Sequence, residues 1–275
     1  MSPVRIMTRK GQIWYNHDCM NDWFHNLPVI WMAVVVFTAV YLSTGAIFAI
    51  IMLLATGARA RVFQGASPGL LSPLGTIFGL LVVFTIFQVW GDFDRARLAV
   101  DREASAIRTV VLLAASFPGE PETQIRNLVR RHIDEAVATE WPEMAKRSAS
   151  LKVAPQALGE LLQFSISLAP QSQGQIVAQR QIVAAVENAM DARRERINLS
   201  QSTVNWVKWS CMFAQAVCAL VAVAMVHSDN RAAAAIAMAI FASGVAVCAL
   251  LIASHDRPFT GEISVKPDVL LQVRP

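Results

Sequence analysis

The architecture of this chain follows from residues 78–107, which read FGLLVVFTIFQVWGDFDRARLAVDREASAI. The first part of this stretch is apolar and the second part is rich in charge, yet only Gly91 interrupts the helical pattern between them. The pattern continues to Pro118, where Pro118, Gly119 and Pro121 give a turn signal. The stretch therefore predicts one long helix that begins inside a membrane and ends outside it.

Three further segments have the length and composition of membrane spans. The hydrocarbon core of a bilayer is roughly 30 Å thick, so a spanning helix needs about 20 mostly apolar residues. The four candidate spans are residues 29–55, 69–90, 203–226 and 232–254. They explain why 55% of the 275 residues are hydrophobic and only 16% are charged. One formal charge, Lys208, lies within a span, in its first turns, where its stem can extend to the headgroups.

The remaining sequence is polar and helical. Apolar residues recur at helical spacing in 125–137, 157–166 and 173–197, and no strand pattern appears. On the charged part of the long helix, one face is predicted to pack against a partner: Leu98, Ala99, Ala106, Val110 and Leu113. Helices that bury one face favour a bundle, formed within one subunit or between subunits. We therefore predict an all-α membrane protein with four transmembrane helices and a cytoplasmic helical bundle between spans two and three.

This prediction divides the chain into five segments. They are an N-terminal interfacial segment (1–28), transmembrane helices 1 and 2 (29–91), a cytoplasmic helical region (92–202), transmembrane helices 3 and 4 (203–254) and a cytoplasmic C-terminal tail (255–275).

The basic residues indicate the orientation. Most of them flank the spans on the side that carries both termini and the middle segment, whereas the opposite side carries Arg59, Arg61 and Arg231. The positive-inside rule therefore places the termini in the cytoplasm. A net charge of +4 that is gathered beside spans is typical of membrane orientation and not of nucleic-acid binding.

An enzymatic function has no support in the motifs. Phosphate-binding loops, nucleophile elbows and spaced metal-ligand pairs are all missing from the sequence, so we expect no catalytic residue, cofactor or metal. The densest group of possible ligands is His17, Asp18, Cys19 and His25. Its spacing fits no usual metal site, and the tryptophans around it favour an interfacial helix in an aromatic belt.

Polar residues inside spans are better functional candidates, because burying them in lipid is costly. Gln215 is interpreted as an interhelical hydrogen-bonding residue ahead of a pore-lining one. In span two, Gly79, Val83 and Phe87 recur at i, i+4 and i+8, and Thr76 extends the same face by one turn. Taken alone, this stripe favours ordinary packing over pore lining.

Several motifs resemble those of the bacterial bestrophin-like domain proteins, a family of four-span membrane proteins. The resemblance covers most of residues 74–273 and rests on a shared order of motifs. These are residues 78–107 with their EAxAI-type segment from Glu103 to Ile107, Glu140-Trp141-Pro142, ARRERINLSQSTVNWVKW (residues 192–209) and Asp256-Arg257-Pro258-Phe259-Thr260-Gly261.

A more distant resemblance links residues 79–95 to bestrophins themselves, which are pentameric anion channels with a hydrophobic neck on the second membrane helix. Gly79, Val83 and Phe87 fall where neck residues lie in that family, although Gly79 replaces a bulky one. Gln88 stands where a basic residue is often found, and no cytoplasmic aperture or calcium clasp can be matched.

This second resemblance implies a homo-oligomeric channel, a pentamer, that conducts inorganic anions such as chloride through the bacterial inner membrane. Thr76, Gly79, Val83 and Phe87 would line its pore. The alternative is a membrane scaffold or stator-like subunit of a larger envelope complex without its own pore. No Asp or Glu lies within a span, which disfavours a proton relay but leaves a passive scaffold open.

Overall fold

The computed structural model describes residues 23–54, 68–152, 154–228 and 230–275. The chain divides into two compact units. The first, here called the membrane unit, comprises residues 1–90 and 203–256, and the second, the polar unit, comprises residues 91–202 and 257–275.

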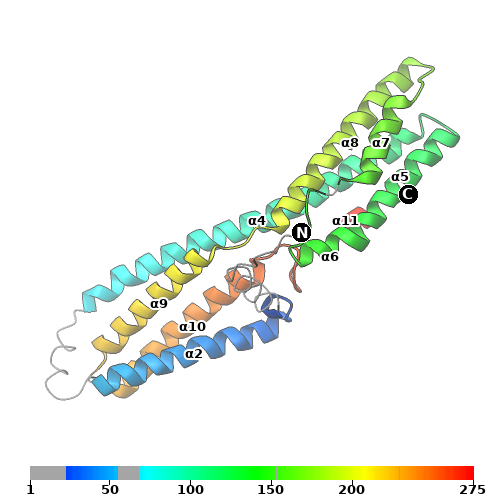
Figure 1. The fold of residues 1–275 in the computed structure, drawn as a ribbon. Helices are drawn as coiled ribbons and strands as arrows, with labels where there is room; N and C mark the ends of the chain where they lie inside the picture. Colours follow the sequence, from blue (N-terminus) through cyan, green and yellow to red (C-terminus); the bar gives the residue numbers. More distant parts are fainter. Residues whose placement is uncertain (1–22, 55–67, 153, 229) are drawn as a thin grey trace, which may run out of the picture. The chain divides into compact units, whose positions relative to one another are not determined.

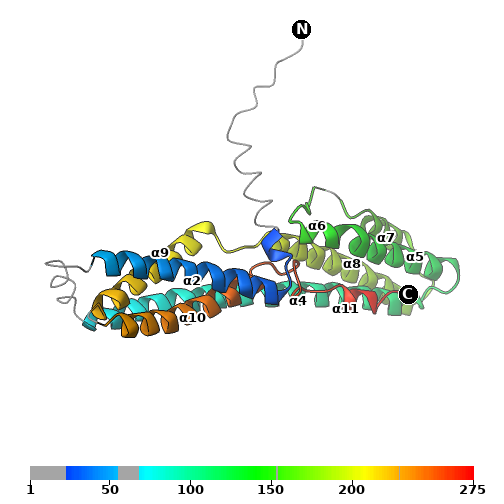
Figure 2. The same cartoon turned by 90° about the horizontal axis from the view of Figure 1, so that it is seen from below.

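The membrane unit is a bundle of long apolar helices (Figures 1 and 2). They are α2 (Val29–Leu54), α9 (Trp206–Val226), α10 (Arg231–His255) and the part of α4 (Leu71–Ala114) up to Trp90, which follows the short 3-10 turn η1 (Pro68–Leu70). Helix α2 packs along α10, and α9 packs against both. Each of the four described helices is long and apolar enough to cross a membrane, as the sequence predicts.

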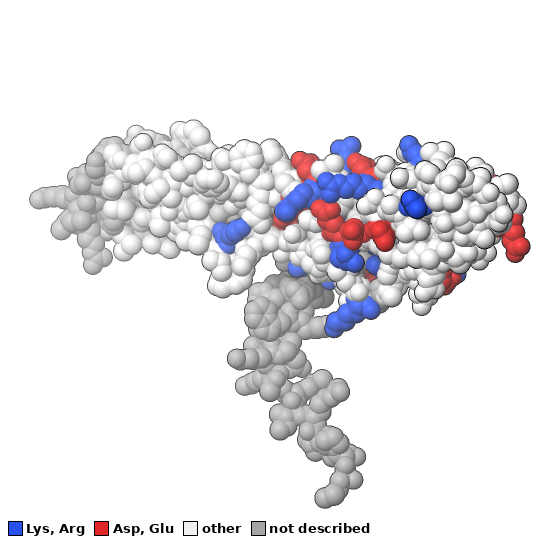
Figure 3. Space-filling model, turned by 90° about the horizontal axis from the view of Figure 1, so that it is seen from above, with Lys and Arg blue, Asp and Glu red and all other residues white. Residues whose placement is uncertain are grey.

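The surface of this unit is suited to lipid. Large apolar side chains are exposed on all four helices, among them Leu42, Phe84, Phe213 and Ile240. On the face shown in Figure 3, charged side chains gather over the polar unit and are nearly missing from the membrane unit. Because an exposed apolar surface of this extent is unfavourable in water, it identifies the part of the chain that lies in the bilayer.

Helix α4 confirms the prediction of one long helix, since it runs without a break through Gly91 to Ala114. In its charged part, Ala99 and Val110 are fully buried, as predicted. Leu98 is not, because half of its side chain is exposed. The packed stripe is centred instead on Ala96, Ala99, Val100, Glu103, Ile107 and Val110.

The polar unit packs the rest of α4 against shorter helices around one core. These are α5 (Glu120–Glu135), the π-helical turn η2 (Ala136–Glu140), α6 (Trp141–Ala145), α7 (Gln156–Ser167), α8 (Gln173–Ser200) and α11 (Asp268–Leu271). Gly119 precedes α5 with φ +96°, a conformation that favours glycine, and so permits the tight turn after α4.

Residues 257–275, which make up most of the predicted C-terminal tail (255–275), are packed into this core. Phe259, Val265 and Leu270 are buried there. The Trp141 indole Nε1 donates a hydrogen bond to the Val265 carbonyl at 3.2 Å. Thr260 Oγ1 donates to the Ala145 carbonyl at 2.8 Å. This segment is therefore a structural part of the polar unit.

Candidate functional site

The membrane part of α4 has one packed face and one exposed face. Phe78, Val82 and Val89 pack inside the unit and are at most 9% exposed. Val83 and Phe87 lie on the other face and are 45% and 66% exposed. Among the described residues, the apolar stripe predicted from sequence is therefore largely exposed, as a face that lines a pore, contacts another subunit or contacts lipid would be.

Thr76 and Gly79 lie on the same stripe. Thr76 is exposed, and its hydroxyl donates to the Ser72 carbonyl of its own helix at 2.9 Å. No heavy atom of the described residues would meet a Cβ built on Gly79 within 4 Å. Both positions therefore have open space beside them.

The exposed face of α4 is wider than the stripe that the sequence predicts. Leu80 and Phe84 are also exposed. They lie one helical turn apart, directly after Gly79 and Val83 in the sequence. Their helical spacing could have indicated that they are exposed. However, large apolar residues in a membrane span also fit ordinary packing between helices.

Polar residues connect α4 to α9 in this unit. Gln215 Nε2 donates to the Leu74 carbonyl at 3.2 Å, which agrees with the interhelical role expected for Gln215. The Lys208 ammonium donates to the Gln88 amide oxygen. The charge of Lys208 is therefore placed beside α4, one residue after Phe87.

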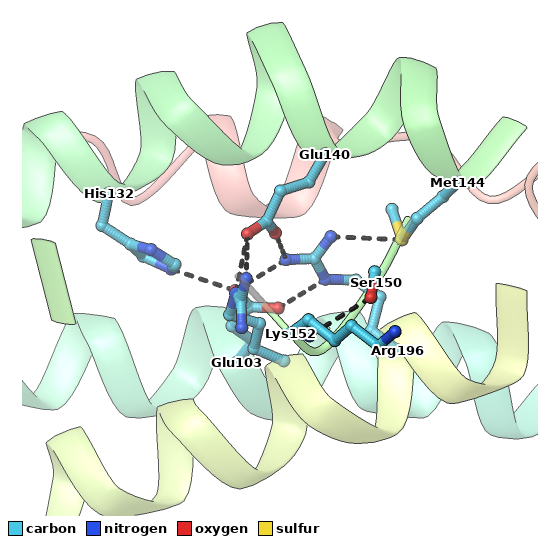
Figure 4. Close-up of polar contacts among 8 residues, drawn as sticks. Glu103, His132, Glu140, Met144, Ser150, Lys152 and Arg196 are labelled. Carbon is cyan, nitrogen blue, oxygen red and sulfur yellow. Dashed lines mark hydrogen bonds and ion pairs between the residues drawn. The ribbon is translucent and has the colours of Figure 1, made fainter. Parts of the chain in front are cut away.

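A second arrangement, which the sequence analysis did not identify, is a buried ionic cluster in the polar unit (Figure 4). Glu103 on α4 and Arg196 on α8 are both fully buried. Arg196 Nε donates to Glu103 Oε2 at 2.7 Å, and Nη2 donates to Glu103 Oε1 at 3.1 Å. Nη2 also donates to Glu140 Oε2 at 2.7 Å. One guanidinium thus binds two carboxylates.

Further contacts complete this ionic cluster. His132 Nε2 on α5 lies 3.0 Å from Glu103 Oε1. Arg193 Nε donates to Glu140 Oε1 at 2.7 Å. The Arg196 guanidinium carbon lies 4.6 Å from the centroid of the Trp141 ring, at a distance suited to a cation–π contact. Because η2 ends in Glu140, the π-helical turn sets where this carboxylate projects.

Glu103 and Arg196 stay ionised at neutral pH. Burial raises the pKa of Glu103, but the charge of Arg196 and the hydrogen bonds from His132 and Arg196 reverse this effect and hold the pKa at about 2. For Arg196, burial lowers the pKa, and the charges of Glu103 and Glu140 more than compensate, so the pKa is raised. Because Glu103 and Arg196 are buried and bonded to each other, their ion pair holds α4 and α8 together, and we infer that it positions these helices.

The ionic cluster also brings together the sequence motifs that resemble those of bestrophin-like domain proteins. Glu103 belongs to the EAxAI-type segment, Glu140 and Trp141 to the Glu-Trp-Pro element, and Arg196 to the basic helix. Phe259 of the last motif packs edge-on against Trp141, with ring centroids 6.0 Å apart. Motifs that lie far apart in sequence therefore meet in one core.

The group of possible ligands near the N-terminus, which was not expected to bind a metal, is only partly described. His17, Asp18 and Cys19 lie outside the described residues. His25 is buried in the membrane unit, with Nε2 3.8 Å from Asp256 Oδ2. Within the described ranges, no group of three His, Cys, Asp or Glu side chains is arranged to hold a metal ion.

These features define a class of protein: a multi-pass, all-helical membrane protein whose second span exposes an apolar stripe. The family comparison identifies it further. The family model described as "Bestrophin-like: Bestrophin-like domain" matches residues 38–270, so the chain belongs to the bestrophin-like family, whose fold is known from ion channels. No curated protein matches the chain.

Solved structures agree with this assignment. A point variant of a bacterial bestrophin homologue from Klebsiella pneumoniae is 12% identical, with a TM-score of 0.69 over 87% of this chain and 97% of that one. Another structure of a homologue from the same organism gives a TM-score of 0.65 at 12% identity, over 86% of this chain and 94% of that one. At this identity the likeness establishes the fold.

Proposed function

We propose that this protein is a homo-oligomeric channel for inorganic anions such as chloride, in which Thr76, Gly79, Val83 and Phe87 line a hydrophobic neck. It is a pentamer by analogy with bestrophins, lies in the bacterial inner membrane and keeps both termini in the cytoplasm. The observation that carries the proposal is the exposed stripe on α4, where Val83 and Phe87 are 45% and 66% exposed among the described residues.

The physical basis is dewetting. A ring of apolar side chains that surrounds a narrow path expels water, and ions then cross only when the ring widens. Phe87 and Val83 supply large apolar surfaces one helical turn apart, so copies of α4 around an axis would form two such rings. Thr76 and Gly79 would continue the same path with a hydroxyl and an open backbone.

Chloride flux tests this proposal. Purified protein in liposomes is expected to release chloride faster than empty liposomes, and Phe87→Ala is expected to raise the flux because it removes one apolar ring. Phe213→Ala is the matched control, since Phe213 is a similarly exposed phenylalanine on α9 that stacks on Trp209. This control is expected to conduct like the wild type.

Liposomes that release no more chloride than empty ones, for both wild type and Phe87→Ala, would contradict a channel. The alternative function, a membrane scaffold or stator-like subunit without its own pore, would then be preferred. It predicts a partner protein recovered in stoichiometric amount when the complex is purified in mild detergent.

A further inference from the structure

Lys208 is an exposed lysine in the first turn of α9. Its ammonium donates a hydrogen bond to the Gln88 amide oxygen on α4. Further along, Gln215 of α9 contacts Leu74 of α4, so the two helices run antiparallel. The lysine is therefore held in the seam between α4 and α9, at the end of the membrane unit where α9 begins.

The described part of the membrane unit supplies no counter-charge to this lysine. Helices α2, α9, α10 and the membrane part of α4 contain no Asp or Glu. The one acidic residue among the described residues of this unit, Asp256, is buried, and its Oδ1 accepts a hydrogen bond from the Val204 backbone N–H at 2.6 Å. Because the Gln88 amide carries no formal charge, it positions the Lys208 ammonium and leaves its charge uncompensated.

The side chains on one side of the Lys208–Gln88 hydrogen bond are typical of a lipid–water boundary. Trp206, two residues before Lys208, is 70% exposed, and Trp90, two residues after Gln88, is 43% exposed. Because α4 and α9 are antiparallel, both tryptophans lie on the same side of this bond. Exposed tryptophan is enriched at the headgroup level of a bilayer, so the ammonium lies next to that level.

The surface on the other side of this hydrogen bond is apolar. Phe84, one helical turn from Gln88 on α4, is 70% exposed. Cys211, three residues after Lys208 on α9, is also exposed. A cation that lies between exposed tryptophans and an exposed apolar surface matches the order of groups in a phospholipid, whose phosphate lies between its headgroup and its acyl chains.

We propose that Lys208 and Gln88 bind the phosphate of an anionic phospholipid whose acyl chains cover Phe84 and Cys211. The lipid supplies the counter-charge that the described membrane helices lack, and basic residues near a membrane surface attract anionic lipids. An ammonium has three N–H donors, so two remain for the phosphate while one is bonded to Gln88. The bond to Gln88 also orients the ammonium beforehand, which lowers the entropy cost of binding. This inference goes beyond the proposed channel function and does not require it.

Lipid titrations of the whole protein in detergent, followed by native mass spectrometry, test the inference. Phosphatidylglycerol, which is anionic, is compared with phosphatidylcholine, which has the same phosphate and acyl chains but no net charge. Wild type is expected to bind phosphatidylglycerol more tightly. Lys208→Gln is expected to weaken this binding about five-fold, because one basic residue is lost at the membrane surface. Lys208→Arg keeps the charge and is expected to keep the affinity.

Gln88→Glu tests the role of the missing counter-charge. It keeps a hydrogen-bond acceptor at the same position and adds a carboxylate beside Lys208. It is expected to remove the preference for the anionic lipid although the lysine stays in place, and it keeps the inference testable if Lys208→Gln fails to assemble. Arg108→Gln is the matched control, since it removes one positive charge from an exposed position of the polar unit. This control is expected to bind phosphatidylglycerol like the wild type.

Equal affinity of the wild type for the two lipids would overturn the inference, and so would unchanged binding of phosphatidylglycerol by Lys208→Gln and Gln88→Glu. An excess of inorganic phosphate is expected to leave lipid binding unchanged. Displacement of the lipid by phosphate would indicate a site for free anions and would also overturn the inference. These measurements do not depend on chloride flux, so a protein that binds the lipid without conducting would contradict the proposed channel alone.

Discussion

Glu103 is a buried charge in the core of the polar unit. Its side chain is fully buried and is bonded by Arg196 and His132. A buried charge is tolerated only when its partners are in place, because removing one partner leaves the other uncompensated in a medium of low polarity. The stability of this unit should therefore depend on Glu103 far more than on the charged pairs at its surface.

We predict that Glu103→Gln lowers the free energy of unfolding by about 3–5 kcal/mol at neutral pH, since Arg196 then loses its principal counter-charge. The pH dependence gives a second signature. The folded-state pKa of Glu103 is about 2, below the usual 4.5, so its contribution is complete above the unfolded pKa and is lost as pH falls through the folded pKa. Wild type should lose about 3 kcal/mol from this group between pH 5 and pH 2.

Unfolding of the purified protein in detergent, followed across that pH range, measures both effects. Glu195→Gln is the control, because Glu195 pairs with Arg102 at 3.2 Å where both side chains are substantially exposed. Such a pair contributes about 0–1 kcal/mol. Equal effects of the two substitutions would contradict the role assigned to the buried cluster.

Sequence reasoning missed this cluster for a physical reason. Charged residues are usually solvated, so the identities of Glu103, Glu140 and Arg196 alone do not predict that they are buried. One signal was available, since Glu103 follows Ala99 by four residues and precedes Ile107 by four, on the same helical face. A charge in the centre of an apolar stripe indicates a buried pair, but its partner on α8 becomes visible only when the helices are packed.

At the level of elements, hydropathy and helical spacing predicted nearly all of the helices. The spans agree with α2, α9, α10 and the first part of α4 to within a few residues, because lipid imposes both length and composition. The π-helical turn η2 was not predicted, since residues 125–141 keep helical spacing and nothing in the spacing marks one inserted residue. The pore stripe stays a prediction, because exposure in one chain fits contact with a pore, a subunit or lipid.

The beginning of α8 gives a test at this scale. The Ser172 hydroxyl caps the helix by accepting a hydrogen bond from the Gln175 backbone N–H at 3.2 Å. We predict that Ser172→Ala destabilises the protein by about 1 kcal/mol, because one N–H of the first turn then lacks its partner.

Denaturant unfolding measures this change. Ser167→Ala serves as the comparison, since the Ser167 hydroxyl donates only to the Phe164 carbonyl at the exposed end of α7. It should change the stability by less than about 0.5 kcal/mol. If the Ser172 cap contributed nothing to stability, the two variants would have the same free energy of unfolding.

For the whole molecule, the two units have contrasting compositions that follow from their surroundings. The membrane unit exposes apolar side chains, and the polar unit carries most of the charge on its surface (Figure 3). Composition alone predicted this contrast. It did not predict that residues 257–275 return to the core of the polar unit, because a short segment with a few apolar residues has no periodicity to reveal its partners.

The proposed orientation is tested by reporters placed on opposite sides of the membrane. The positive-inside rule places Lys152, between α6 and α7, in the cytoplasm and the turn at Ser228, between α9 and α10, in the periplasm. Green fluorescent protein inserted after Lys152 should therefore fluoresce, and alkaline phosphatase inserted after Ser228 should be active. The reverse pattern would require the termini to lie outside the cytoplasm.

The packing of residues 257–275 links the maturation of one unit to that of the other. A ribosome completes residues 91–202 before it makes α9 and α10, and only afterwards supplies Phe259, Val265 and Leu270. Until then, Trp141 and its neighbours lack their last apolar partners, so the nascent polar unit keeps an exposed apolar surface that is prone to aggregation. This surface can therefore be buried only after both later spans have been synthesised.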